Sequence, residues 1–186
     1  MKVLQLTKDT DYEIYQQISS LHKSSFTKTI ATTLTTNRLS RLYIFLIQNN
    51  LLKVIYIQIG ETVAGCASYS QKNKNYTPKQ LFELCLISLT GLILHPIVWI
   101  IESYFKKGLY KDLKFESKLV TLFVNKELQN KSIASGLVCY IKENESLPIV
   151  VDTRNINNSA LNFYSKNGFR TVNKNKRNFV LLFQNS

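Results

Sequence analysis

The 186-residue chain contains few cysteines and histidines, and this shortage excludes whole classes of site. Its three cysteines, Cys66, Cys85 and Cys139, are odd in number, lie far apart and form no CxxC pair. The two histidines, His22 and His95, stand alone, so no Cys/His group has the spacing of zinc ligands. Because each cysteine lies in an apolar run, we expect buried reduced thiols, no disulfide framework, no metal and a reducing cytoplasmic environment.

Acidic residues are also scarce, since 12 Asp and Glu stand against 24 Lys and Arg, for a formal net charge of +12. Such an excess suits an anionic partner, which includes nucleic acid, an acidic membrane surface or a phosphorylated ligand. The charge does not choose among these partners, and no segment carries a dedicated nucleic-acid motif. The basic residues are scattered along the chain, which favours an ordinary solvated surface.

The residues at the start do not have the pattern of a secretory signal, so we expect none, and we find no internal repeat or low-complexity tract. Met1-Lys2 leads into a short strand-like run and then into the acidic residues Asp9, Asp11 and Glu13. Hydrophobic residues make up 45% of the chain and charged residues 19%, which is ordinary for a globular protein. The length suits one compact domain with a real core.

The first 71 residues predict a strand, two helices and a hairpin. Apolar residues recur at helical spacing in the two helical segments, whereas the hairpin strands alternate around the turn signal Gly60-Glu61. The predicted elements are a strand at Lys2–Leu6, helices from Asp9 or Thr10 to Phe26 and at Ile30–Gln48, and strands at Lys53–Ile59 and Thr62–Ser70.

After the polar residues 72–76, the segment Leu81–Phe105 is strongly apolar and admits three interpretations. The residue before a proline is biased away from helix, so we expect a break at His95-Pro96. Glu83 and Glu102 stand near its two ends, and basic residues flank both sides. These features favour two short buried or groove-lining helices, the second beginning at Pro96. Contact with a membrane surface or a protein partner, and a true membrane span, are the alternatives.

The last third of the chain predicts a strand–helix–strand–helix unit followed by a hairpin. Pro148 opens a nearly continuous apolar run that is typical of a strand buried on both faces. The predicted elements are strands at Lys118–Val124 and Ile149–Val151, helices at Ser132–Asn144 and Ala160–Lys166, a left-handed Gly168 that ends the second helix, and a hairpin of Phe169–Val172 with Asn178–Phe183.

The turn between the first strand and helix of this unit has the composition of an anion site. The segment Gln129–Ser135 is small or polar, contains one lysine and leads into a helix. The unpaired backbone N–H groups at a helix N-terminus bind phosphate and pyrophosphate groups. The sequence therefore predicts a phosphate-binding loop here.

Two linked motifs resemble the acetyl-CoA signatures of the GNAT N-acetyltransferase superfamily. The first is Leu122-Phe123-Val124 followed by Gln129-x-x-Ser132-x-Ala134. The second is Asn157-x-x-Ala160-x-x-Phe163-Tyr164-x-x-x-Gly168-Phe169. The detailed resemblance covers Leu119 to Phe169, and the order of the preceding elements fits the same fold coarsely.

The resemblance implies an α/β (α+β) fold with a mixed, mostly antiparallel sheet of about seven strands flanked by helices. It implies one domain over residues 1–186, with a helical insertion at 72–115 between the third and fourth strands and an acetyl-CoA core at 117–170. The implied activity is direct transfer of an acetyl group from acetyl-CoA to a primary amine of a small molecule, such as an amino sugar, or of a peptide. A CoA-binding module that docks to a membrane or partner through Leu81–Phe105 is the alternative, and a homodimer is left open.

The resemblance also implies roles for individual residues. Tyr164 would be the general acid beside the thioester sulfur, while Glu116 is a weak candidate for general base, because Lys118 stands where many relatives carry Glu. A water-mediated base, or none, is the alternative. Ser132 replaces a glycine, so its Cβ would crowd the phosphates unless its φ is negative. The implied cofactor-binding residues are Leu122, Phe123, Val124, Gln129, Asn130, Lys131, Ser132, Ile133, Ala134, Ser135, Asn157, Ala160 and Tyr164.

Overall fold

The computed structural model describes residues 1–26, 29, 31–71, 77–94, 109–110, 112–129 and 132–184. Its elements are β1 (Val3–Gln5), α1 (Tyr12–Ser25), the 3-10 turn η1 (Ala31–Thr33), α2 (Thr36–Gln48), β2 (Lys53–Ile59), β3 (Thr62–Gln71), α3 (Pro78–Leu94), β4 (Ser117–Val124), the 3-10 turn η2 (Lys126–Leu128), α5 (Ile133–Asn144), β5 (Ile149–Arg154), α6 (Asn158–Lys166), β6 (Arg170–Lys174) and β7 (Asn178–Phe183).

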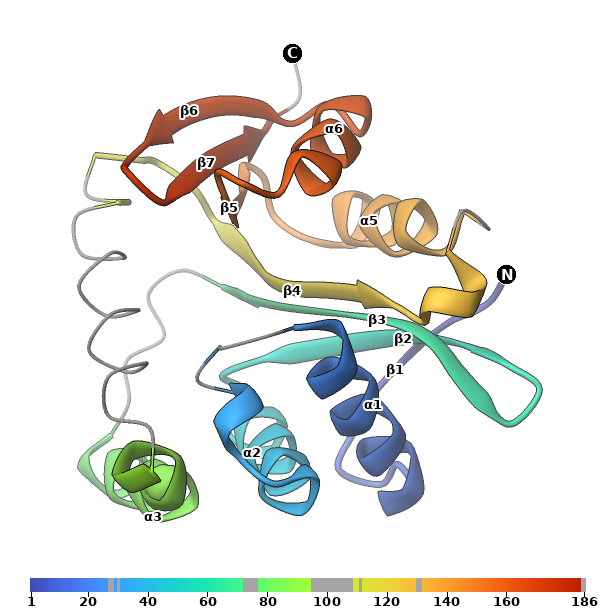
Figure 1. Cartoon of the computed structure of the whole chain (residues 1–186), viewed down its shortest axis with the longest axis vertical. Coiled ribbons are helices and arrows are strands. Elements are labelled where there is room, and N and C mark those ends of the chain that lie inside the picture. Colours follow the sequence, from blue (N-terminus) through green and yellow to red (C-terminus); the bar gives the residue numbers. More distant parts are fainter. Residues whose placement is uncertain are drawn as a thin grey trace.

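The strands form one seven-stranded sheet in the order β1-β2-β3-β4-β5-β7-β6 (Figure 1). Every neighbouring pair is antiparallel except β4 and β5, which run parallel. Helix α3 lies in the chain between β3 and β4. The predicted mixed, mostly antiparallel sheet with a helical insertion between its third and fourth strands is confirmed.

Helices cover both faces of the sheet, with α1 and α2 on one side and α5 and α6 on the other (Figure 1). One buried cluster joins α5 and α6 to the sheet through residues such as Leu119, Leu137 and Tyr164. A second cluster joins α1 and α2 to the opposite face through residues such as Ile18 and Phe123. Strand β4 therefore contributes side chains to both cores, as expected of a central strand that is buried on both faces.

Helix α2 begins later than the sequence predicts. Its first residue is Thr36, because the side chain of Thr35 accepts a hydrogen bond from the backbone N–H of Arg38 and caps the helix. The short turn η1 takes up the residues before this cap, and Ile30, the predicted start, lies outside the described residues. The apolar periodicity continued through the turn, so periodicity alone placed the boundary too early.

Helix α3 starts at Pro78, a position where a missing N–H does no harm, and it ends at Leu94, just before the predicted break. The predicted second helix from Pro96 lies outside the described residues. We expected this helix to be buried or to line a groove. Burial is wrong for part of its surface, because Phe82 is 67% exposed and Leu86 is 53% exposed. Within the described residues, no helix has the length and apolar character needed to cross a membrane.

Strands β4 and β5 separate soon after they meet, and this separation creates the site. Strand β4 pairs with β3 from Ser117 to Val124, but it pairs with β5 only over Ser117–Leu119. A register shift opposite Ser68 and Tyr69 marks the point where the strand bends away. Beyond Leu119 the edge of β4 that faces away from β3 has no paired strand among the described residues.

Candidate functional site

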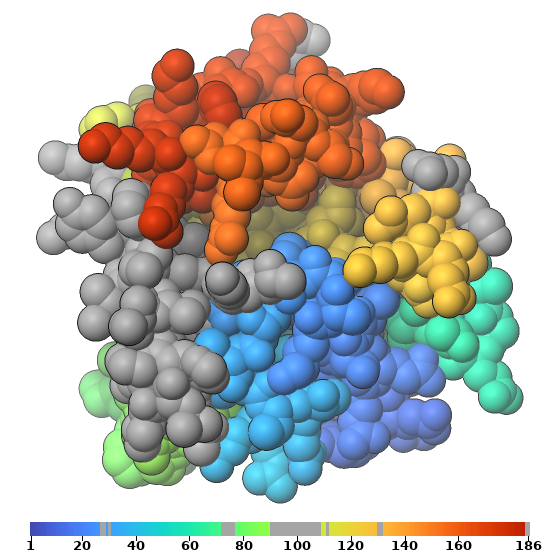
Figure 2. All heavy atoms as spheres, in the orientation of Figure 1, coloured from blue at the N-terminus to red at the C-terminus, as the bar shows by residue number. Residues whose placement is uncertain are grey.

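A pocket of about 530 Å³ occupies the space where β4 leaves β5. It lies between the end of β4, the start of α5 and the start of α6, and the end of α1 closes one side. Figure 2 shows a recess on this face between α6 and α1, with β4 visible at its floor. Pockets of about 300–1,000 Å³ are typical of small-molecule sites.

Every predicted cofactor-binding residue that the structure describes lines this pocket. Asn130 and Lys131 lie outside the described residues. The predicted residues that line the pocket are Leu122, Phe123, Val124, Gln129, Ser132, Ile133, Ala134, Ser135, Asn157, Ala160 and Tyr164.

The start of α5 presents backbone donors to the pocket. The first intrahelical hydrogen bond runs from the N–H of Gly136 to the carbonyl of Ser132, at 2.9 Å. The N–H groups of Ile133, Ala134 and Ser135 precede it and have no acceptor within the helix. All three residues line the pocket, so this helix end is suited to an anion.

Ser132 holds this turn in a conformation that normally belongs to glycine. Its φ is 58° and its ψ is 12°, which is the left-handed region. We expected the Cβ of Ser132 to avoid crowding the phosphates only at a negative φ. The observed φ is positive, so this condition is not met. An L-residue in this region is strained by about 1–2 kcal/mol. Ser132 makes no side-chain cap to α5, so no such bond offsets the strain.

Gly65 on β3 lets the first turn of α5 approach the sheet closely. A Cβ at this position would lie 2.7 Å from the Cγ2 atom of Ile133 and 3.2 Å from that of Val124. A contact of 2.7 Å requires the neighbour to move. The absent side chain at Gly65 thus helps to set the position of the predicted phosphate loop relative to the end of β4.

The end of β4 offers backbone hydrogen-bonding groups along its open edge. Leu122, Phe123 and Val124 pair with β3 on one side only. Their remaining backbone groups face the region where the pocket lies. Such groups must find partners in water or in a ligand, because a buried unpaired N–H or C=O is costly. This edge is suited to bind an extended ligand that carries amide groups.

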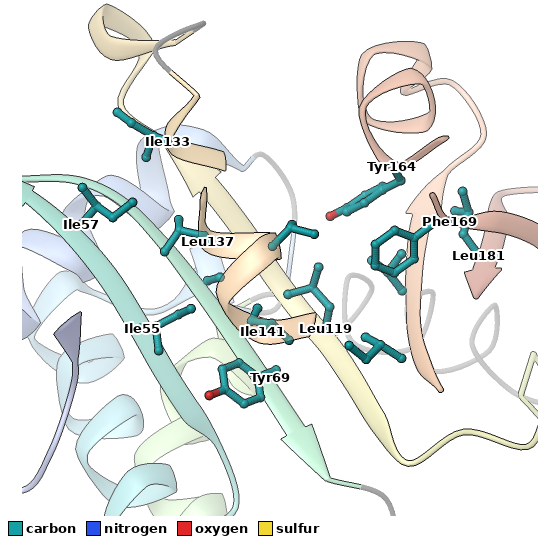
Figure 3. Packing of buried hydrophobic residues seen from close by; sticks show 14 of the residues in the cluster. Ile55, Ile57, Tyr69, Leu119, Ile133, Leu137, Ile141, Tyr164, Phe169 and Leu181 are labelled. Atoms are coloured by element: carbon teal, nitrogen blue, oxygen red, sulfur yellow. The ribbon is translucent and has the colours of Figure 1, made fainter. Parts of the chain in front are cut away.

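Tyr164 projects from α6 into the pocket and is 7% exposed. Its ring packs edge-on against Phe163 and Phe169, at centroid distances of 5.3 Å and 5.5 Å. Figure 3 shows its hydroxyl pointing away from Phe169, toward the α5 side of the site. Burial, and secondly the charge of Asp152, raise the pKa of Tyr164, so the phenol keeps its proton at neutral pH.

Asn157 caps α6 at the edge of the pocket. Its Oδ1 accepts a hydrogen bond from the backbone N–H of Ala160, at 3.1 Å. The cap fixes the first turn of α6, and with it the side of the pocket that carries Ala160 and Tyr164. The predicted left-handed Gly168, with a φ of 80°, follows the end of the same helix.

Glu116 does not reach this pocket. It is exposed and precedes β4, where its N–H bonds to the carbonyl of Pro148 at 2.9 Å. A strand advances by about 3.3 Å per residue, so Glu116 lies roughly 20 Å along the chain from Leu122. The pocket begins at the other end of the strand.

Asp152 on β5 is the carboxylate that acts on Tyr164, and sequence reasoning missed it. It follows directly after the last β5 residue that pairs with β4. Its Oδ1 lies 3.2 Å from the Nζ of Lys118 and accepts a hydrogen bond from the hydroxyl of Tyr110. Its side chain is 13% exposed. Only the parallel pairing of β4 with β5 brings it beside Lys118, which no local motif could signal.

The pocket also includes residues from outside the two motifs. Ser25 and Phe26 come from the end of α1, and Lys126 comes from η2. Lys126 brings a cationic side chain to the site, beside Gln129. Its place just before the loop could have been noticed in the sequence, whereas the approach of α1 depends on tertiary packing. Within the described residues, no group of three or more His, Cys, Asp or Glu residues could hold a metal.

Solved structures match the chain over its whole length, although no protein-family model and no curated protein matches it. The PaiA N-acetyltransferase of Thermoplasma acidophilum, in complex with coenzyme A, is 13% identical, with a TM-score of 0.58 and 100% of each chain covered. NAA60 of Arabidopsis thaliana, in complex with acetyl-CoA, is 11% identical, with a TM-score of 0.57 and 98% of each chain covered. A GNAT-family protein of Desulfovibrio desulfuricans is 10% identical, with a TM-score of 0.53 and 98% of each chain covered.

The chain has the GNAT fold. The predicted resemblance is confirmed at the level of fold, since identities of 10–13% carry no more than that. Two of the matched GNAT structures contain CoA or acetyl-CoA, as their own ligands.

Proposed function

We propose that this protein is an N-acetyltransferase that moves an acetyl group from acetyl-CoA directly to a primary amine. The observation that carries the proposal is the convergence of three unlike features on one pocket. These are the N-terminus of α5, the open edge of β4 and the protonated hydroxyl of Tyr164. Each meets a different part of an acyl-CoA: the pyrophosphate, the amide-bearing arm and the thioester.

Binding follows from these positions. The pyrophosphate lies against the N–H groups of Ile133–Ser135, with Lys126 nearby as a counter-charge. The pantetheine arm runs along Leu122–Val124, where its amides pair with the backbone of β4. Asn157 and Ala160 line the other side of the arm.

The transfer step uses the end of β4 and Tyr164. The amine nitrogen attacks the thioester carbonyl carbon, and the new C–N bond pushes the carbonyl electrons onto oxygen. A β4 N–H near Phe123 or Val124 stabilises this oxyanion. The tetrahedral intermediate collapses, the C–S bond breaks, and Tyr164 gives its proton to the departing sulfur. The former amine nitrogen releases one proton to water, and water returns a proton to the phenol of Tyr164. The products are an amide and CoA.

The acceptor must lose a proton, and Asp152 is the group we assign to attract it. After burial, the charge of this carboxylate is the second cause that raises the pKa of Tyr164, and this effect supports the assignment, although Asp152 itself does not line the pocket. Lys118 and Tyr110 hold it in place. An acceptor that arrives as an ammonium ion is drawn to this carboxylate and releases its proton there or to water. A small amine such as an amino sugar, or a peptide amine, fits this chemistry.

The primary test is calorimetry of the whole chain with acetyl-CoA, followed by thiol release with a panel of primary amines. We expect saturable binding and amine-dependent release of CoA. Absence of binding at millimolar acetyl-CoA would overturn the proposal. Tyr164→Phe serves as the comparison, since it should keep binding and lose turnover.

A CoA-binding module without turnover is the second candidate. Two observations favour it: the strained Ser132 in the phosphate loop, and the lack of a carboxylate or histidine among the described pocket-lining residues. Binding of acetyl-CoA with no thiol release on a wide amine panel, and with no effect of Tyr164→Phe, would favour this candidate over the enzyme.

A further inference from the structure

The two ends of the pocket differ in polarity, which orients any acyl-CoA within it. The end at α5 carries Gln129, Ser132 and the free N–H groups of the helix. The end at α1 carries Phe26 and Phe123. On the function proposed above, the phosphates occupy the α5 end. The thioester and its acyl group therefore point toward the aromatic end.

Two phenylalanine rings close that aromatic end. Phe26 directly follows the last residue of α1, and Phe123 lies on β4. Their ring centroids are 5.9 Å apart and their planes meet at 86°, which is a favourable edge-to-face contact. Phe123 is 4% exposed, so its ring cannot swing outward without displacing other side chains. The pair forms a wall across the end of the pocket.

His22 supports this wall from behind. Its ring centroid lies 5.0 Å from that of Phe26 and 5.1 Å from that of Phe123. Its Nδ1 shares a 2.6 Å hydrogen bond with the hydroxyl of Tyr43. His22 and Tyr43 are both buried, at 5% and 4% exposed. Moving the wall backward would break this bond in a closely packed core, which is unfavourable.

Among the described residues, the lining of the aromatic end includes no charged side chain. Its lining residues within the described chain are Ser25, Phe26, Leu122, Phe123, Phe163 and Tyr164. The basic side chain that lines the pocket, Lys126, belongs to η2, which precedes the phosphate loop. A carboxylate on the acyl group would therefore have no cationic partner among these described lining residues, and burying it there is costly.

We propose that Phe26 and Phe123, with His22 as a positioning residue, restrict the thioester to a short and uncharged acyl group. The pocket accepts acetyl-CoA and rejects butyryl-CoA for its length and succinyl-CoA for its charge. One methylene in an apolar pocket changes discrimination by roughly 10–200-fold. Two added methylenes that meet a fixed wall should therefore reduce affinity by at least about tenfold.

The test is calorimetry of the full chain with CoA, acetyl-CoA, butyryl-CoA and succinyl-CoA. We expect acetyl-CoA to bind at least about tenfold more tightly than butyryl-CoA or succinyl-CoA. Phe26→Ala removes one ring of the wall, so it should raise the affinity for butyryl-CoA relative to acetyl-CoA by about tenfold. The affinity for succinyl-CoA should stay low. Phe26→Leu should give an intermediate ratio. Because the readout is a ratio within one variant, a general loss of folding does not mimic it.

Phe82→Ala is the matched control, since Phe82 lies on α3, is 67% exposed and does not line the pocket. Its ratios should equal those of the unmodified chain. Equal binding of acetyl-CoA and butyryl-CoA by the unmodified chain, or an unchanged ratio in Phe26→Ala, would overturn this inference alone. Failure of all four ligands to bind would overturn the proposed function and this inference with it.

Discussion

The two ends of strand β4 differ in almost every property that bears on function. At its start, Ser117–Leu119 is hydrogen-bonded to β3 on one edge and to β5 on the other. At its end, Leu122–Val124 is bonded to β3 alone and lines a pocket. The residue types at the two ends differ as well, since Ser117-Lys118-Leu119 has one apolar residue and Leu122-Phe123-Val124 has three. The difference in hydrogen bonding comes from the neighbouring strand, whose pairing with β4 stops at Leu119.

The charges divide in the same way. At the start of β4, Lys118 pairs with Asp152, so each charge has a partner. At its end, the pocket is lined by backbone N–H groups at the start of α5, a neutral phenol and the side chain of Lys126. The start of β4, bonded on both edges, is the closed end, and its charges are paired. The end of β4, bonded on one edge, is the open end, and it offers fixed hydrogen-bond donors to a ligand. Five changes test this comparison.

Removing the hydroxyl of Tyr164 should have the largest effect at the open end. Tyr164→Phe deletes the proton that meets the departing sulfur, so thiol release should fall by roughly 10²–10⁴-fold. The Kd of acetyl-CoA should change little, since the ring remains. Thiol release and calorimetry measure the two quantities. Tyr140→Phe, on the far side of α5, is the control and should keep full turnover.

Acid should destabilise the open end through His22. Burial lowers the pKa of His22 from 6.5 to about 4, so the folded state holds the neutral ring. The unfolded chain binds the proton first, so stability is greatest above pH 6.5 and falls as pH drops toward 4. The loss reaches about 3 kcal/mol below pH 4. Urea unfolding at pH 7 and pH 4 measures it, and His22→Gln should remove this part of the pH dependence.

Filling the gap at Gly65 should disturb the contact between β3 and the start of α5. Gly65→Ala puts a methyl group 2.7 Å from Ile133, so overpacking should lower stability by about 1–3 kcal/mol and weaken CoA binding. Gly136→Ala is the matched control, because its added Cβ meets only Ile57 at 3.8 Å. It should stabilise α5 by about 0.5–1 kcal/mol. Equal destabilisation by both would contradict the close packing inferred here.

Neutralising Asp152 and neutralising Glu116 should have different effects on the rate of thiol release. Asp152→Asn removes the charge that acts on Tyr164 and on an incoming ammonium, so thiol release should fall by about tenfold, or about 1.4 kcal/mol in the barrier. Glu116→Gln should leave the rate unchanged, because Glu116 is exposed and distant from the pocket. A larger loss in Glu116→Gln than in Asp152→Asn would reverse the assignment.

Relieving the strain at Ser132 should have the smallest effect and the opposite sign. Ser132→Gly suits the left-handed conformation, so stability should rise by about 1 kcal/mol. Removal of the Cβ also lets a phosphate approach the loop more closely, so the Kd of CoA should decrease. Thermal unfolding and calorimetry measure both. A drop in stability would mean that the hydroxyl makes a contact that outweighs the strain.

The sequence alone predicted the fold class, most of the elements and a set of residues that the structure brings together around one pocket. These predictions succeeded because the relevant signals are local. Alternation predicts strands such as β2, a capping Asn157 predicts the start of α6, and Gly168 predicts its end. The two motifs lie within 51 consecutive residues, from Leu119 to Phe169, so their spacing reports on one compact unit.

Only the tertiary structure decided which distant groups join that unit. Phe26 reaches the pocket, with His22 packed behind it, because α1 packs against β4. Asp152 meets Lys118 because β5 runs parallel to β4 for three residues. The left-handed conformation of Ser132 arises where the loop must turn into α5 over Gly65. Composition and periodicity describe one segment at a time, whereas these features depend on how two segments meet. The pocket residues that belong to the two motifs could therefore be predicted from the sequence, whereas the aromatic wall, the position of Asp152 and the left-handed turn at Ser132 could not.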